Sequence, residues 1–81
     1  MSSQPRRVVT FDGEALRDWR ERAGLTAAET ARRARISTQR LWQIETGRRS
    51  TVFVSTAWRI RGAIGAPEDA QLYAAPQPVA A

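Results

Sequence analysis

The sequence contains no cysteine, no histidine and no lysine. Without cysteine the chain has neither a disulfide nor a thiolate metal site, and without histidine it lacks the commonest general base and metal ligand. No apolar run is long enough to span a membrane, and the N-terminus lacks the apolar stretch of a signal peptide. We therefore expect no catalytic residue, no metal or other cofactor and no membrane contact, in a cytoplasmic protein.

The positive charge is carried by arginine alone. All 13 basic residues are arginine, and the net charge is +5. Arginine is the better bidentate partner for phosphate and guanine, although a GC-rich genome would also favour arginine over lysine. Residues 10–31 contain five acidic residues and three arginines, whereas residues 32–61 contain eight arginines and one acidic residue. A basic half of this kind indicates a surface that meets nucleic-acid phosphates.

Capping residues predict three helices in the first half of the chain. The first covers about 12–23, with Asp12 as its N-cap. The second covers about 26–34 and begins with a capping box. The third follows a tight turn and covers about 37–46. Two short helices joined in this way are typical of the helix-turn-helix, whose second helix enters the DNA major groove.

A fourth helix and a short fifth helix are expected to follow. Thr51 or Ser55 is the candidate cap of the fourth helix, and Gly65 ends it. The fifth would begin at Pro67 and end near Tyr73. The predicted fold class is therefore all-α, a compact four- to five-helix bundle without a sheet. The predicted core consists of Leu16, Trp19, Ala31, Ile36, Leu41, Ile44, Trp58, Ile60 and Ile64.

The length of 81 residues predicts one folded domain. We place it at residues 11–74. Residues 1–10 are expected to form a flexible N-terminal arm that carries Arg6 and Arg7, and residues 75–81 a disordered tail.

The central segment resembles the Cro/C1-type helix-turn-helix family of bacterial and phage regulators, also called the Xre family. The resemblance covers about residues 11–66 and is carried by LRDWRERAGLT, ARRARIS and LWQIETGRR. The distances along the chain from one small residue to three apolar residues are those of the family; these residues are Ala31, Ile36, Leu41 and Ile44. The resemblance implies a lambda-repressor-like fold and a double-stranded DNA operator as the partner.

The resemblance also implies which residues contact DNA. The third helix would read base edges with Thr38, Gln39, Arg40, Trp42 and Gln43. Phosphate contacts would come from Thr26, Arg32, Arg35, Ser37, Arg48 and Arg49. The chemistry agrees, since glutamine pairs bidentately with adenine and the threonine methyl group contacts that of thymine. A buried ion pair of the family matches Arg20 and Glu45, which we expect to be structural.

The sequence departs from the family at several positions. Ala27 stands where many members have a glutamine that helps to hold a phosphate, and Thr30 replaces an apolar core residue. Arg35 replaces the usual glycine of the turn, which costs roughly 1 kcal/mol if the residue is left-handed. Relative to the family, the sequence has one extra residue between Gly47 and Ile60, before the fourth helix. Trp42 is expected to point outward or to lean on Arg35 in a cation–π contact.

Two functions fit this sequence. The first is a sequence-specific regulator, a Cro-like repressor that reads the major groove with helix 37–46 and dimerises through its fourth and fifth helices. Candidate dimer contacts are Phe53, Leu72 and Tyr73. The second is an interaction module on the same fold, such as an antitoxin or a phage protein that binds a host protein through Trp42.

Overall fold

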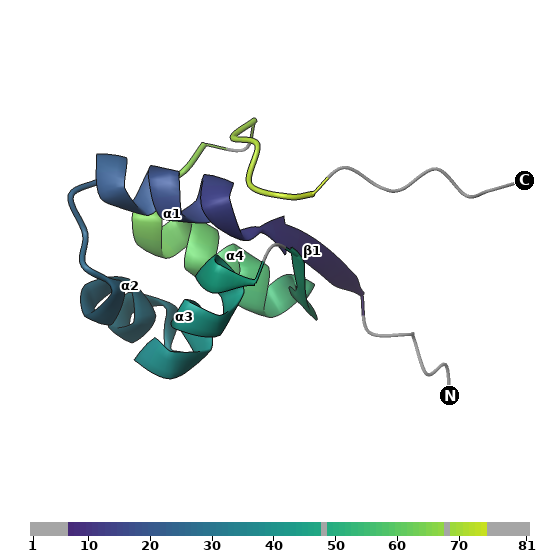
Figure 1. Ribbon diagram of the computed structural model, residues 1–81, viewed down its shortest axis with the longest axis horizontal. Helices are drawn as coiled ribbons and strands as arrows, with labels where there is room; N and C mark the ends of the chain where they lie inside the picture. The colour runs from purple at the N-terminus through teal and green to yellow at the C-terminus, as the bar shows by residue number, and fades with distance from the viewer. Residues whose placement is uncertain (1–6, 48, 68, 75–81) are drawn as a thin grey trace, which may run out of the picture.

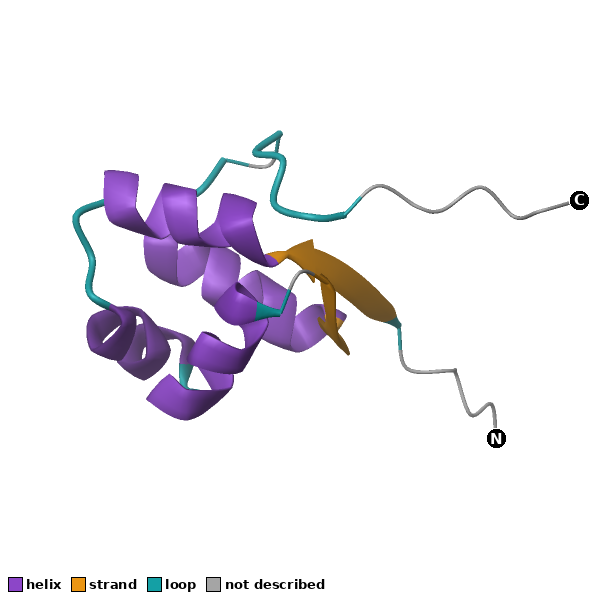
Figure 2. Ribbon diagram, in the orientation of Figure 1, coloured by secondary structure: helices purple, strands orange, loops and turns teal. Residues whose placement is uncertain are grey.

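The computed structural model describes residues 7–47, 49–67 and 69–74. In chain order its elements are β1 (Val8–Asp12), α1 (Gly13–Arg22), α2 (Ala27–Ala34), α3 (Thr38–Thr46), β2 (Arg49–Phe53) and α4 (Val54–Ile64). The helices pack together, and the two strands lie at one end of the helical cluster (Figures 1 and 2).

The all-α prediction is wrong, because β1 and β2 form a two-stranded antiparallel sheet. Val9 lies opposite Val52, and Phe11 lies opposite Ser50. Both strands are rich in β-branched and aromatic residues, and they alternate between a buried and a solvent-facing side. Phe11 and Val52 are buried in the core. The sheet includes residues 8–10, predicted to belong to the N-terminal arm, and residues 49–53, predicted to form a loop before the fourth helix.

The predicted fifth helix is also absent from the described part of residues 67–73. This segment runs past α1 toward β1 (Figure 1). There Asp12 N–H donates to the Leu72 carbonyl and Ala74 N–H donates to the Thr10 carbonyl, both at 2.8 Å. The Leu72 side chain is fully buried. Pairing with the outer edge of β1 satisfies the backbone and buries Leu72, whereas an isolated helix this short has little stability of its own.

The capping predictions for the first three helices are confirmed. The Asp12 carboxylate accepts from the first turn of α1, Thr26 and Glu29 form the capping box of α2, and the Ser37 hydroxyl caps α3. The fourth helix differs from the prediction. It begins directly after β2, with Phe53 at the N-cap position and no side-chain cap.

Most of the predicted core is confirmed, with one clear error. The buried members are Leu16, Ala31, Leu41, Ile44, Ile60 and Ile64, while Trp19 and Ile36 are partly buried and pack against them. Trp58 is instead 62% exposed. The buried stripe of α4 passes through Ala57, and the next residue along a helix is rotated by about 100° from it. Trp58 therefore faces solvent.

Gly13 allows a close contact between the start of α1 and the end of α3. A Cβ atom at this position would overlap the backbone carbonyl oxygens of Ile44, Glu45 and Gly47. The N-terminus of α1 thus faces the C-terminus of α3, an arrangement in which the two helix dipoles attract. A side chain at residue 13 would force the two helices apart.

Candidate nucleic-acid interface

α3 has one anchored side and one solvent-facing side. Leu41, Ile44 and Glu45 are buried against the rest of the domain. Every residue predicted to read bases is exposed on this helix: Thr38, Gln39, Arg40, Trp42 and Gln43. The fold therefore leaves these side chains accessible on a helix that is fixed from behind.

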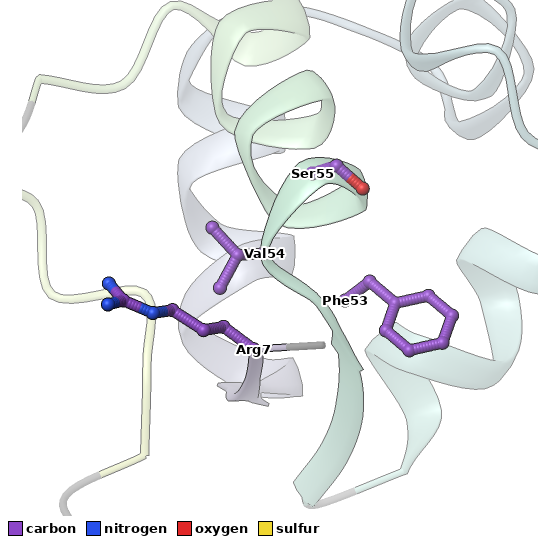
Figure 3. Close-up of a pocket in the computed structure, with 4 residues that line it drawn as sticks. All are labelled: Arg7, Phe53, Val54 and Ser55. Atoms are coloured by element: carbon purple, nitrogen blue, oxygen red, sulfur yellow. The ribbon is translucent and has the colours of Figure 1, made fainter. Parts of the chain in front are cut away.

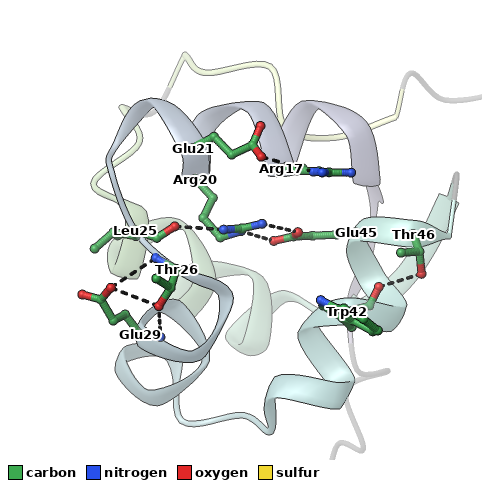
Figure 4. A network of polar contacts seen from close by, with 9 residues as sticks. All are labelled: Arg17, Arg20, Glu21, Leu25, Thr26, Glu29, Trp42, Glu45 and Thr46. Atoms are coloured by element: carbon green, nitrogen blue, oxygen red, sulfur yellow. Dashed lines mark hydrogen bonds and ion pairs between the residues drawn. The ribbon is translucent and has the colours of Figure 1, made fainter.

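A buried ion pair fixes the C-terminal half of α3. Arg20 Nε donates to Glu45 Oε2 at 2.6 Å, and a second guanidinium nitrogen donates to Glu45 Oε1 at 2.9 Å (Figure 4). A third bond, at 2.8 Å, reaches the Leu25 carbonyl in the loop before α2. The two charged side chains are only 12% and 3% exposed. One arginine thus ties α1, the α1–α2 loop and α3 together, which is the structural role expected for this pair.

The hydrogen bond to Glu45 raises the pKa of Arg20 above its ordinary value, in spite of the opposing effect of burial. The arginine therefore stays charged at any physiological pH. Removing either partner would leave the other buried and unpaired, which is costly in a protein interior. We infer that the orientation of α3 depends on both residues.

An arginine whose backbone is in the left-handed conformation forms the turn between α2 and α3, and a second arginine, from α4, stabilises this turn. Arg35 has φ 59° and ψ 43°, the conformation that glycine adopts most easily. Arg59 Nε donates to the Ala34 carbonyl at 3.0 Å, so it satisfies one of the free carbonyls at the end of α2. This role of Arg59 could not be predicted from the sequence, since the partners are 25 positions apart and no local pattern links them.

The predicted phosphate-contacting residues fall into two groups. Arg32 and Arg35 are exposed on α2 and in the turn, and Ser37 is exposed before α3, where its hydroxyl accepts from the Arg40 N–H at 2.9 Å. Thr26 is exposed too, but its hydroxyl already accepts from the Glu29 N–H and contacts the Glu29 carboxylate. The backbone and hydroxyl hydrogen bonds from Thr26 lower the pKa of Glu29.

The remaining arginines of the prediction are described only in part. Arg6 and Arg48 lie outside the described residues, and Arg49 is described only by its backbone position at the start of β2. Arg7 is exposed, and its carbonyl accepts from Val54 N–H at 3.0 Å.

Trp42 is 63% exposed on α3, as the outward orientation requires. The cation–π contact found among the described residues involves a different tryptophan: the guanidinium carbon of Arg22 lies 6.0 Å from the centre of the Trp19 ring. An aromatic ring of this size on the surface of a small domain is a candidate contact for a binding partner.

A pocket lies at the start of α4. Arg7, Phe53, Val54 and Ser55 line it, and the Phe53 ring points away from the Arg7 and Val54 side chains (Figure 3). Within the described part of the chain there is no cluster of three or more acidic, histidine or cysteine residues that could hold a metal ion. No helix in the described ranges is long and apolar enough to cross a membrane.

Comparison with protein families gives one match. A model described as a helix-turn-helix domain matches residues 13–77, which is most of the chain. The chain belongs to this helix-turn-helix family. The helix-turn-helix of this protein is α2, the turn at Arg35 and α3. This kind of domain binds DNA, so the membership supports a DNA-binding regulator. Neither curated proteins nor solved structures gave a significant match.

Proposed function

We propose that this protein is a sequence-specific double-stranded DNA-binding regulator of the Cro/C1 type, which acts as a repressor by occupying its operator. The observation that supports this most directly is the build of α3. It presents a row of exposed polar and aromatic side chains, while Leu41, Ile44 and the Glu45 ion pair hold it from behind.

The proposed base contacts differ chemically along α3. Gln39 and Gln43 each carry an amide that pairs bidentately with adenine, and the Thr38 methyl group fits against the thymine methyl. Arg40 suits guanine, and Trp42 offers an apolar contact. All of these side chains are exposed.

Phosphate contacts are assigned to exposed groups on neighbouring elements. Arg32 lies in the last turn of α2, Arg35 follows the end of this helix, and Ser37 is the N-cap of α3. For Arg48 and Arg49, the assignment to phosphate contacts rests on the family resemblance alone. Such contacts set the register of the protein on the duplex without reading its sequence.

Binding as a homodimer to two half-sites is part of the proposal, because one recognition helix reads only a few base pairs. The prediction that the fourth and fifth helices form the dimer contact has to be revised. The fifth helix is not formed in the described segment, and Leu72 is fully buried and therefore unavailable to a partner.

The test combines selection of bound duplexes from a random pool with three single substitutions. Gln43→Ala removes a base contact, Arg32→Ala removes a phosphate contact, and Arg17→Ala removes an exposed arginine from α1 as the matched control. Each variant is measured on the selected duplex and on a scrambled duplex over a salt series. Gln43→Ala should weaken the selected duplex by about 1–3 kcal/mol and relax the preference at one base pair of each half-site.

Arg32→Ala should weaken both duplexes alike and reduce the slope of log K against log salt by about one, while Arg17→Ala should change neither. Equal weakening of both duplexes by Gln43→Ala would contradict the assignment of α3. If the wild-type protein binds no duplex at low salt, the whole proposal fails.

The exposed Trp42 favours a second candidate, an interaction module such as an antitoxin or a phage protein that binds a host protein. In that case Trp42→Ala should abolish binding to the protein partner. The wild-type protein should then bind its protein partner with no measurable affinity for duplex DNA, and measurable duplex binding would contradict this candidate.

A further inference from the structure

The two edges of the small sheet differ. The outer edge of β1 is covered by the C-terminal segment, through the hydrogen bonds that Asp12 and Thr10 make with Leu72 and Ala74. Within the described ranges no strand pairs with the outer edge of β2. Unpaired edges recruit other strands unless the protein blocks them.

Thr51 lies at the middle of this outer edge. It is opposite Thr10 in the register, and the Thr10 carbonyl points away from β2, where it accepts from Ala74. In an antiparallel sheet, opposite residues of one pair direct their backbone groups either both toward each other or both away. The Thr51 N–H and carbonyl therefore point outward from the sheet. Thr51 is exposed, so another chain has access to these groups.

β2 carries few of the features that protect natural edge strands. After Arg49 its residues are uncharged, it contains no proline, and its register with β1 is continuous without a bulge. The solvent-facing side of the sheet is also partly apolar. Val8 and Phe53 lie opposite each other and are 52% and 45% exposed.

We propose that the outer edge of β2 pairs antiparallel with the same edge of a second copy of this chain, about a two-fold axis at Thr51. Each Thr51 N–H donates to the Thr51 carbonyl of the other copy. Within one copy the hydroxyl oxygens of Thr10 and Thr51 are 3.1 Å apart. Pairing aligns four threonines in a row across the joined sheet, a favourable cross-strand arrangement.

The position of this edge suits a second copy better than an unrelated strand. A two-fold axis makes one edge complementary to itself. α3 ends at Thr46 and β2 begins at Arg49, so joined β2 strands would hold the two α3 helices in one fixed relation. Reading two half-sites needs such a relation, and this part of the argument rests on the proposed function.

The size of the edge indicates a weak dimer. A strand of five residues is about 17 Å long, and its edge covers much less than the roughly 1,200 Å² buried in stable complexes. In free solution the pairing should need high protein concentration. On an operator, two adjacent half-sites raise the effective concentration and complete the dimer.

Three substitutions at Thr51 test this. Thr51→Lys places like charges opposite each other across the axis, and Thr51→Pro removes the outward N–H while leaving the bonds to β1 intact. Thr51→Val keeps a β-branched residue and the backbone donor, and serves as the matched control. Sedimentation equilibrium measures self-association, and amide exchange at several concentrations measures protection of the residue 51 N–H.

The wild-type protein should self-associate with a Kd below about 1 mM, and protection of the Thr51 amide should rise with protein concentration. Thr51→Lys and Thr51→Pro should weaken association at least about tenfold, and Thr51→Val should retain it. The proposal is overturned if the wild type stays monomeric at about 1 mM, if the lysine and proline variants associate like the wild type, or if protection of the Thr51 amide does not depend on concentration.

Binding to a duplex with one half-site separates this proposal from the proposed function. Thr51→Lys should bind a single half-site as the wild type does, and lose cooperativity on two. Self-association through Thr51 in a protein that binds no duplex would refute the DNA-binding function and leave the edge pairing intact.

Discussion

Replacing Thr30 with valine should stabilise this protein. Thr30 is fully buried on α2, and among the described residues its hydroxyl oxygen has no hydrogen-bond partner. A buried polar group without a partner costs about 1–3 kcal/mol. Valine has nearly the same shape, replaces the hydroxyl with a methyl group, and has a similar helix propensity. We therefore expect Thr30→Val to raise the free energy of unfolding by at least about 1 kcal/mol.

Urea denaturation monitored by tryptophan fluorescence would measure this change, with an unchanged m-value showing that the unfolded state is not altered. For a domain of this size, 1 kcal/mol corresponds to a rise of about 4–8 °C in Tm. The matched control is Thr30→Ser, which keeps the hydroxyl and deletes the methyl group, and should lower stability by about 1 kcal/mol. A valine variant that is no more stable than the wild type would show that the hydroxyl has a partner. Duplex affinity should not change, because Thr30 does not reach the surface.

Three further substitutions have defined outcomes. Gly13→Ala should destabilise the fold by about 3 kcal/mol or more in chemical denaturation, since its Cβ overlaps backbone carbonyls that cannot move aside; a loss below 1 kcal/mol would contradict the close contact. Glu45→Gln should lower Tm more than it lowers intrinsic DNA affinity, because it strands the buried Arg20 charge; an unchanged Tm with altered binding would refute the structural role. Arg35→Gly should raise stability by roughly 0.5–1 kcal/mol by relieving the left-handed conformation, and should weaken all duplexes alike if Arg35 contacts phosphate; lower stability would refute the strain.

The helices could be predicted because their signals are local. Asp12, Thr26 and Ser37 each cap a helix that begins at the next residue. The sheet could not be predicted in the same way. Its strands are five residues long, each runs directly into a helix, and Thr10 pairs with a residue 41 positions away. Nothing within a short window of sequence indicates such a partner.

The error at Trp58 has a related cause. The sequence offers Thr51 and Ser55 as caps for the fourth helix, whereas the helix begins at Val54 after a strand. Its apolar residues cover more than one face in the sequence, and only the packing of Ala57, Ile60 and Ile64 shows which side is buried. The candidate site is easier to predict from the sequence, because Leu41 and Ile44 define the inner face of α3 and leave the residues of the other face exposed. The roles of the outer residues in DNA binding stay predictions.

The pairing of residues 72–74 with β1 has a consequence for how the chain folds during its synthesis. β1 is the first described element, but its two partners are β2 and a segment more than 60 positions downstream, since Ala74 bonds to Thr10. At about 5–20 residues per second, the ribosome needs several seconds to supply the second partner after β1 has emerged. During this interval the nascent chain exposes Phe11 and one open strand edge, both of which favour association with other chains. α1, α2 and α3 are all synthesised before this partner, so they precede the step in which residues 72–74 close the core around Leu72.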